Sequence, residues 1–125
     1  MKKVINSKNA PAAIGPYSQA VEVNGFVYLS GQLPIDPNTG EFPKGGIKEQ
    51  TTQSFENIKA ILSEAGLTTD NIVKTLVLLA DMNDFAEMNE VYASQFNGTF
   101  PARSAFAVKT LPKGALVEIE VIAAR

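Results

Sequence analysis

An arginine and a glutamate near the C-terminal end of the chain, Arg103 and Glu118, are the side chains best suited to chemistry. An arginine guanidinium binds a carboxylate through two parallel hydrogen bonds. A glutamate that is partly removed from water acquires a raised pKa and serves as a general acid or base. The same pair is also compatible with an exposed ion pair, which contributes only about 0–1 kcal/mol to stability. The residue types alone leave both interpretations open.

The predicted geometry of this pair depends on a C-terminal hairpin. Two strand-like runs follow each other here, with Pro112-Lys113-Gly114 in the turn between them. If the strands pair, Glu118 lies opposite Ala105, give or take one register step, and Arg103 is its diagonal neighbour at about 7 Å between Cα atoms. The cation and the acid then flank a small hollow floored by alanines. The small Ala105 favours a binding site over an ion pair, because an ion pair needs no cavity beside it.

Two residue types that dominate enzyme chemistry are missing, because the sequence contains no Cys and no His. Thiolate nucleophiles, iron–sulfur clusters, Ser-His-Asp triads and imidazole or thiolate metal ligands are therefore excluded. Asp36 and Asp81 have no companions at ligand spacing, so we expect no metal site. Any catalysis must use carboxylates, Lys, Tyr, hydroxyls, Arg and backbone N–H groups.

Four further residues are candidates for binding, each with an ordinary structural alternative. Tyr17 lies in a loop rich in Pro and Gly, where it is either a ligand contact or a packed surface anchor. Ser30-Gly31 follows an apolar run, and a glycine there lets a ligand approach the backbone N–H, or simply ends the strand. Asn89 lies on a predicted helix and is equally typical of a surface position.

The N-terminal part of the sequence predicts strands separated by loops. Val4 and Ile5 predict a short first strand, and two apolar runs flank Asn24-Gly25, the strongest short signal for a hairpin. Residues 34–46 contain three prolines and three glycines and predict a long surface loop.

From Ile47 onward the apolar residues recur at intervals of three and four, which predicts an amphipathic helix ending at Gly66. Residues 72–80 are rich in β-branched residues and leucine and predict a central strand. The apolar positions of the predicted helix are Phe55, Ile58, Ile61, Leu62 and Ala65.

A second helix follows, with Asn83 or Asp84 as its cap and Glu87 placed for a capping box. Residues 103–109 and 116–123 complete the chain as two strands. The apolar face of the second helix comprises Phe85, Met88, Val91, Tyr92 and Phe96.

The resulting order, β-β-β-α-β-α-β-β, predicts an α+β fold in which two helices cover one face of a single mixed sheet. We expect one domain over residues 1–125. The first hairpin and the last strand carry apolar residues at odd and at even positions alike. Both faces of these strands are therefore predicted to be apolar, including the face that the helices leave open. Subunits are therefore expected to associate through their sheets.

The net charge and the hydropathy of the sequence limit the kinds of partner and the cellular location that we expect. Eleven Lys and Arg stand against 13 Asp and Glu, a net charge of −2, which makes nucleic acid an unfavourable partner. The densest apolar stretch, residues 76–80, is too short to cross a bilayer. The basic N-terminal residues lack the apolar run of a signal peptide, so we expect a cytoplasmic protein.

Taken together, several motifs spread over residues 10–124 resemble the RidA/YjgF family, small imine deaminases also labelled L-PSP or translation-inhibitor homologues. The Arg-to-Glu segment is the most specific part of the resemblance. The matching stretches are Ile14-Gly15-Pro16-Tyr17-Ser18-Gln19-Ala20, Leu29-Ser30-Gly31-Gln32-Leu33-Pro34, residues 57–66, Met82-Asn83-Asp84-Phe85, Met88-Asn89-Glu90-Val91-Tyr92, Pro101-Ala102-Arg103-Ser104 and residues 111–120.

The resemblance implies a chorismate-mutase-like fold and a homotrimer, with the sheets forming a central barrel and clefts between subunits, each cleft built from two chains. It implies hydrolysis of 2-imino acids and their enamine tautomers, such as 2-iminobutanoate and 2-iminopropanoate, to 2-keto acids and ammonia. Pyridoxal-phosphate-dependent dehydratases release these reactive compounds, so the implied role is control of metabolite damage. The reaction needs no metal or other cofactor.

Carried over residue by residue, the resemblance implies that Arg103 binds the substrate carboxylate and Glu118 activates the attacking water. Tyr17, Ser30, Gly31 and Asn89 would line the cleft, with Gly31 offering its backbone N–H. The chain departs from many relatives at Ala105, where they carry a cysteine. Thiol-based roles of those relatives are therefore not expected here.

Two other functions remain as alternatives. The same cleft would serve a regulatory module that senses a 2-keto or amino acid, which requires the arginine but not the glutamate. A ribonuclease, the label attached to some relatives, is disfavoured by the net charge of −2 and the absence of His.

Overall fold

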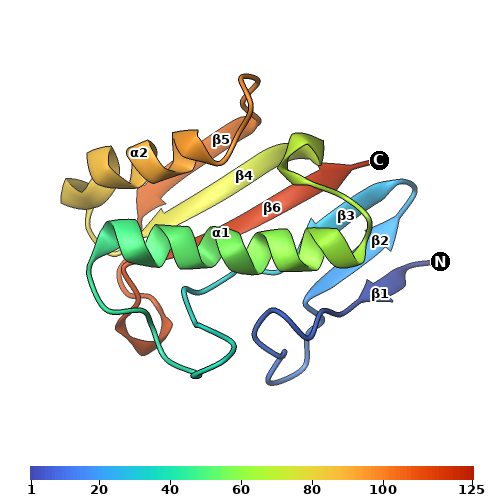
Figure 1. Cartoon of the computed structure of the whole chain (residues 1–125), viewed down its shortest axis with the longest axis horizontal. Coiled ribbons are helices and arrows are strands. Elements are labelled where there is room, and N and C mark those ends of the chain that lie inside the picture. Colours follow the sequence, from blue (N-terminus) through green and yellow to red (C-terminus); the bar gives the residue numbers. More distant parts are fainter.

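The computed structural model describes all 125 residues, and it places two α-helices on one face of a six-stranded mixed sheet (Figure 1). The predicted fold class and order of elements are confirmed. The elements are β1 (Lys3–Ile5), β2 (Ala20–Val23), β3 (Phe26–Leu29), α1 (Ile47–Glu64), β4 (Ile72–Leu79), α2 (Phe85–Ser94), β5 (Ala102–Ala107) and β6 (Val117–Ala124).

The strand order, β1-β2-β3-β6-β4-β5, corrects the predicted C-terminal hairpin. β4 lies between β5 and β6, pairing parallel with β5 and antiparallel with β6. The physical reason is the connection through α2, because parallel strands are joined by a crossover that packs a helix on the sheet. β5 and β6 are consecutive in the chain but are not neighbours in the sheet.

Local signals place most element boundaries correctly. Asn24 and Gly25 have φ of 52° and 81°, as the tight turn of the β2–β3 hairpin requires. Gly66, with φ of 74°, follows the last residues of α1 as predicted. Asp84 is the N-cap residue of α2, as predicted, but its side chain makes no capping bond; Asp81 instead accepts from the Asn83 N–H in the preceding 3-10 turn.

The core lies between the sheet and the two helices. Phe55, Ile58 and Ile61 of α1 are fully buried against alternate residues of the central strands. On β6 this alternation points Val117 and Ile119 toward the helices and Glu118 toward the open face, as the parity of the sequence predicts.

The open face of the sheet carries large apolar side chains in contact with solvent. Phe26 and Tyr28 of β3 and Phe106 of β5 are each exposed by 41–48%. This agrees with the apolar second face expected from the sequence. No helix of the chain has the length and apolar character that a membrane span requires.

Candidate functional site

Arg103 is held on the helix-covered face of β5 by side chains of α2. Its Nη1 donates to Oδ1 of Asn89 over 2.6 Å, and its guanidinium lies 4.7 Å from the ring centre of Tyr92 and 5.4 Å from that of Phe85. These cation–π contacts orient the guanidinium plane. Arg103 forms no salt bridge within the chain, so the ion-pair interpretation of the sequence is excluded here. Its remaining N–H donors are free to bind an anion.

Tyr92 provides the aromatic ring against which the Arg103 guanidinium packs. The ring is buried, and its hydroxyl shares a 2.7 Å hydrogen bond with the hydroxyl of Thr75 on β4. Burial raises the pKa of the Tyr92 hydroxyl, so the group is neutral at physiological pH. From the sequence, Tyr92 is predicted only as part of the apolar face of the second helix. Its contact with Arg103 depends on tertiary packing, which the sequence pattern does not indicate.

A hollow of about 330 Å³ opens beside the arginine. It is partly apolar and large enough for a small organic acid. Its lining residues are Asn89, Tyr92, Ala93, Phe100, Pro101 and Arg103.

Glu118 lies in a separate place, half-buried on β6 against the loop after β3. Desolvation raises the pKa of its carboxyl, and the charge of Glu120 raises it further. A Cβ atom added at Gly31 would collide with the Glu118 carboxylate, so the missing side chain lets the backbone approach this acid closely. A raised carboxyl pKa beside a backbone segment is the environment that a general acid or base requires.

Tyr17 and Ser30 lie in the same region as Gly31, at the end of β3 and in the loop bonded to it. Ser30 Oγ donates to the Ser18 carbonyl over 2.6 Å, which ties the Tyr17 loop to the end of β3. Tyr17 is 51% exposed, and its hydroxyl accepts a long hydrogen bond of 3.4 Å from the Ile14 N–H. Tyr17 and Gly31 both line a hollow of about 600 Å³.

The structure places the six predicted residues in two separate groups rather than in one, and we refer to these groups as half-sites. Asn89 and Arg103 make the first; Tyr17, Ser30, Gly31 and Glu118 make the second. Arg103 pairs with Thr75 and Glu118 with Leu78, and β4 separates their strands. With strands about 4.8 Å apart and a rise of about 3.3 Å per residue, their Cα atoms are roughly 14 Å apart.

The two side chains also point to opposite faces of the sheet. Arg103 contacts α2, whereas Glu118 alternates with the buried residues that face the helices. The predicted diagonal contact within one chain, with its alanine floor, is wrong because it assumed that β5 pairs with β6. A site that uses both groups on one small molecule needs two chains.

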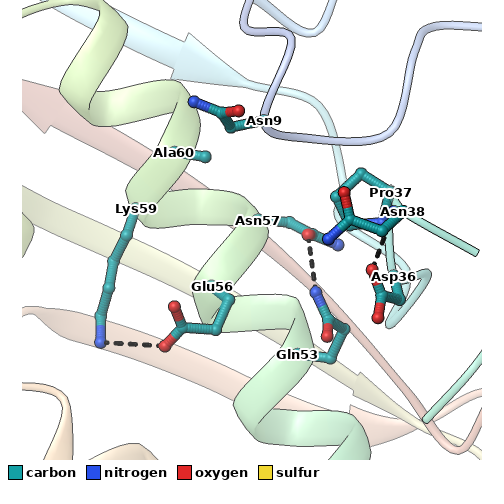
Figure 2. A pocket seen from close by; sticks show the side chains of 9 residues that line it. All are labelled: Asn9, Asp36, Pro37, Asn38, Gln53, Glu56, Asn57, Lys59 and Ala60. Atoms are coloured by element: carbon teal, nitrogen blue, oxygen red, sulfur yellow. Dashed lines mark hydrogen bonds and ion pairs between the residues drawn. The ribbon is translucent and has the colours of Figure 1, made fainter.

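A third hollow, of about 410 Å³, lies between α1 and the loops at Asn9 and residues 36–38, and none of the six predicted residues lines it (Figure 2). The structure brings no three His, Cys, Asp or Glu side chains together at a spacing that would hold a metal ion.

Solved structures with this architecture belong to the class of YjgF-type α+β proteins. A protein of unknown function from Yersinia pestis, described as a member of the conserved Rid family, superposes with a TM-score of 0.97 at 54% identity over 100% of both chains. At the sequence level, the family model described as Endoribonuclease L-PSP matches residues 7–125. The chain belongs to this family, the RidA/YjgF family.

Two curated relatives show the range of names within the family. A RutC family protein of Pyrococcus horikoshii is 57% identical over 98% of this chain and 98% of its own length. A mouse protein named 2-iminobutanoate/2-iminopropanoate deaminase is 52% identical over 98% of this chain and 91% of its own length. The family is shared by both, while only the second name states an activity.

Proposed function

We propose that this protein hydrolyses small 2-imino acids, such as 2-iminobutanoate and 2-iminopropanoate, to 2-keto acids and ammonia in the cytoplasm. The observation that carries the proposal is the Arg103 guanidinium, which is oriented by aromatic rings and lacks any carboxylate partner. Such a group is prepared to bind the carboxylate of an anionic substrate. The deaminase name of the mouse relative supports the same reaction.

The proposed assembly is a cyclic homotrimer with one cleft at each subunit boundary. Head-to-tail contacts of this kind bring different surfaces of the same chain together. The Arg103 half-site of one subunit would then face the Glu118 half-site of its neighbour. The exposed apolar side chains on the open sheet face, Phe26, Tyr28 and Phe106, support association, because subunit contact removes such apolar surface from water.

In the proposed mechanism, Arg103 holds the substrate carboxylate and Asn89 keeps the arginine in place. Glu118 takes a proton from a water molecule as the water oxygen bonds to the imine carbon, and the electrons of the C=N bond move to nitrogen. Glu118 then donates that proton to the nitrogen, which gives a carbinolamine. Glu118 next takes the proton of the new hydroxyl group and delivers it to the amine nitrogen as the C–N bond breaks, so that the 2-keto acid forms and ammonia leaves. One carboxyl group thus acts as base and then as acid. General acid–base catalysis of this kind accelerates a reaction by about 10²–10⁴-fold.

The other predicted residues line the cleft. The Gly31 N–H is proposed to bind the substrate beside Glu118, and Ser30 holds this segment through its bond to Ser18. Tyr17 is proposed to close the pocket. An imine carbon is already electrophilic, so water needs only modest activation, and the proposed steps use neither a metal nor another cofactor.

A coupled assay tests the proposed function. A threonine dehydratase releases 2-iminobutanoate, and adding this protein should accelerate the appearance of 2-ketobutyrate in proportion to its concentration. An unchanged rate over a wide range of protein concentration would contradict the proposal.

A ligand-sensing module is the second candidate, because the Arg103 hollow is complete in a chain whose Glu118 lies elsewhere. Binding of a 2-keto acid would then occur without turnover. Ribonuclease activity, which the family description names, is less well supported. A net charge of −2 gives little attraction for RNA phosphates.

Gly31→Ala should reduce turnover by about 10- to 100-fold, because the added methyl displaces the Glu118 carboxylate from its place. The melting temperature should fall little, since the atom displaced is the end of a flexible side chain. Gly46→Ala is the matched control, because a Cβ there meets open space. Full turnover in Gly31→Ala would show that the close approach of Gly31 and Glu118 is unimportant.

Glu118 should also make stability depend on pH. Because its pKa is raised in the folded chain, folding is disfavoured once the carboxyl ionises, and this penalty disappears below the ordinary value of 4.5. Arg103→Ala removes the cation that we propose faces Glu118 in the assembly. In that background, Glu118→Gln should raise the melting temperature at pH 7 and leave it unchanged at pH 4. An equal effect at both pH values would contradict the sign of the shift.

A further inference from the structure

Three of the four buried polar side chains of α1 bond to backbone groups outside the helix. Gln50, Ser54 and Asn57 are exposed by 7%, 0% and 0%, and their spacing of four and three residues places them on one side of the helix. We refer to them as the polar seam. Each one bonds to backbone groups of the segments that carry Gly31 and Glu118.

Ser54 contacts the point where these two segments meet. Its Oγ donates to the Gln32 carbonyl over 3.1 Å. The same carbonyl accepts from the Ile119 N–H over 3.2 Å, and the Gln32 N–H donates to the Ile119 carbonyl over 2.7 Å. Gln32 follows Gly31 and Ile119 follows Glu118, so Ser54 bonds directly to the bridge between them.

The other two members hold the segments on either side. Gln50 Oε1 accepts from the Leu116 N–H over 2.8 Å, two residues before Glu118. Asn57 Nδ2 donates to the carbonyls of Leu33 and Ile35, over 3.1 and 2.9 Å.

Figure 2 shows Asn57 reaching from α1 toward the loop at Pro37 and Asn38. Its Oδ1 accepts from Gln53 Nε2 over 3.0 Å, which fixes the orientation of the amide. Both ends of the Asn57 amide are therefore satisfied, as a buried polar group requires.

The bridge needs this support because it is isolated. Gln32 lies beyond the end of β3 and forms an isolated bridge to Ile119 of β6, so no ladder of bonds continues from this pair. The loop that follows Gln32 makes no backbone bond of its own to the sheet, and such a loop moves easily relative to the sheet. Ser54 and Asn57 tie this loop to α1 and restrict that movement, and Gln50 ties the residue before β6 to the same helix.

We infer that the polar seam, and Ser54 above all, positions the backbone of Gly31 against Glu118 and so sets the geometry of the second half-site. The inference rests on the proposed function for its catalytic consequence. The seam residues touch neither the proposed substrate nor Glu118 itself, so they act as positioning residues.

The chain supplies a matched control one turn earlier on the same helix. Thr51 is also fully buried, but its hydroxyl has no hydrogen-bond partner. Thr51→Val and Ser54→Ala each delete one buried hydroxyl from α1, and only Ser54→Ala breaks a tie to the bridge.

The experiment compares the two variants by turnover, by affinity for 2-ketobutyrate and by amide hydrogen exchange. Ser54→Ala should lower kcat about tenfold, because small displacements of reacting groups are costly. Its affinity for 2-ketobutyrate should stay within about twofold of the wild type, because Arg103 is untouched. The amides of Gln32 and Ile119 should exchange faster in Ser54→Ala only.

The outcomes separate this inference from the proposed function. An inactive wild-type protein would refute the deaminase proposal, and the exchange rates would still decide whether Ser54 holds the bridge. Equal exchange in the two variants, or equal kcat in an active protein, would overturn the inference. If Ser54→Ala does not fold, Ser54→Cys keeps the side-chain volume with a weaker donor and is judged by the same measurements.

Discussion

Arg103→Ala should reduce kcat/KM for imine hydrolysis by at least about 100-fold, because a bidentate charged contact to the substrate carboxylate is lost. The expected result includes loss of 2-keto acid binding, since the same guanidinium holds the product. The protein should remain folded and assembled, because the arginine is only partly buried and its side chain makes a single hydrogen bond. Coupled assays and calorimetric titration with 2-ketobutyrate measure the two effects.

Lys109→Ala is the control for this substitution. It removes an exposed cation soon after β5 and should leave both measurements unchanged. Arg103→Lys keeps the charge but not the planar donor pair, so we expect it to recover only part of the affinity. Wild-type activity in Arg103→Ala would contradict the proposed role of this half-site.

Glu118→Gln should lower turnover by about 10²–10⁴-fold while 2-keto acid binding persists. The amide keeps the shape of the side chain but neither accepts nor returns a proton at neutral pH. This variant also separates the two candidate functions, since a sensor needs Arg103 and tolerates the loss of Glu118. The measurements are single-turnover kinetics and equilibrium binding on the same preparation.

Glu120→Gln is the matched control, because Glu120 occupies the same face of β6 two residues away and is exposed. Its loss removes only a neighbouring charge and should change turnover by no more than about threefold. If Glu118→Gln and Glu120→Gln behave alike, Glu118 is not the acid–base group.

The elements of the fold follow from short-range signals in the sequence. The Asn24-Gly25 turn, the period of α1 and the alternation in β6 each depend on neighbouring residues only, and the structure confirms them. The sequence also predicts the cap position of α2 at Asp84, but the side-chain capping bond does not form there, because a 3-10 turn precedes the helix and Asp81 accepts the bond from Asn83.

The pairing of the C-terminal strands could not be read from the local turn signal at Pro112. A glycine-containing turn between two strands predicts a hairpin only if no other strand intervenes. The β4–α2–β5 succession was the better signal, because a strand, a helix and a strand favour parallel pairing. Using it would have placed Arg103 beside β4 and away from Glu118.

The polar seam illustrates a different limit. Polar residues in an amphipathic helix are ordinarily assigned to its solvated face. Gln50, Ser54 and Asn57 instead face backbone groups of a loop whose position depends on the whole fold. Periodicity alone does not distinguish these two environments.

The central claim is that Arg103 and Glu118 act on one substrate from different subunits, and subunit mixing tests it most directly. Arg103→Ala and Glu118→Gln chains carrying different tags are coexpressed, and mixed assemblies are isolated by both tags. In every mixed closed trimer, whether it holds two chains of one variant or two of the other, one cleft of the three receives an intact arginine and an intact glutamate. We therefore expect the isolated mixed assemblies to recover about a third of the wild-type activity, although each variant alone is inactive. Mixed assemblies as inactive as their parents would contradict a site shared between subunits.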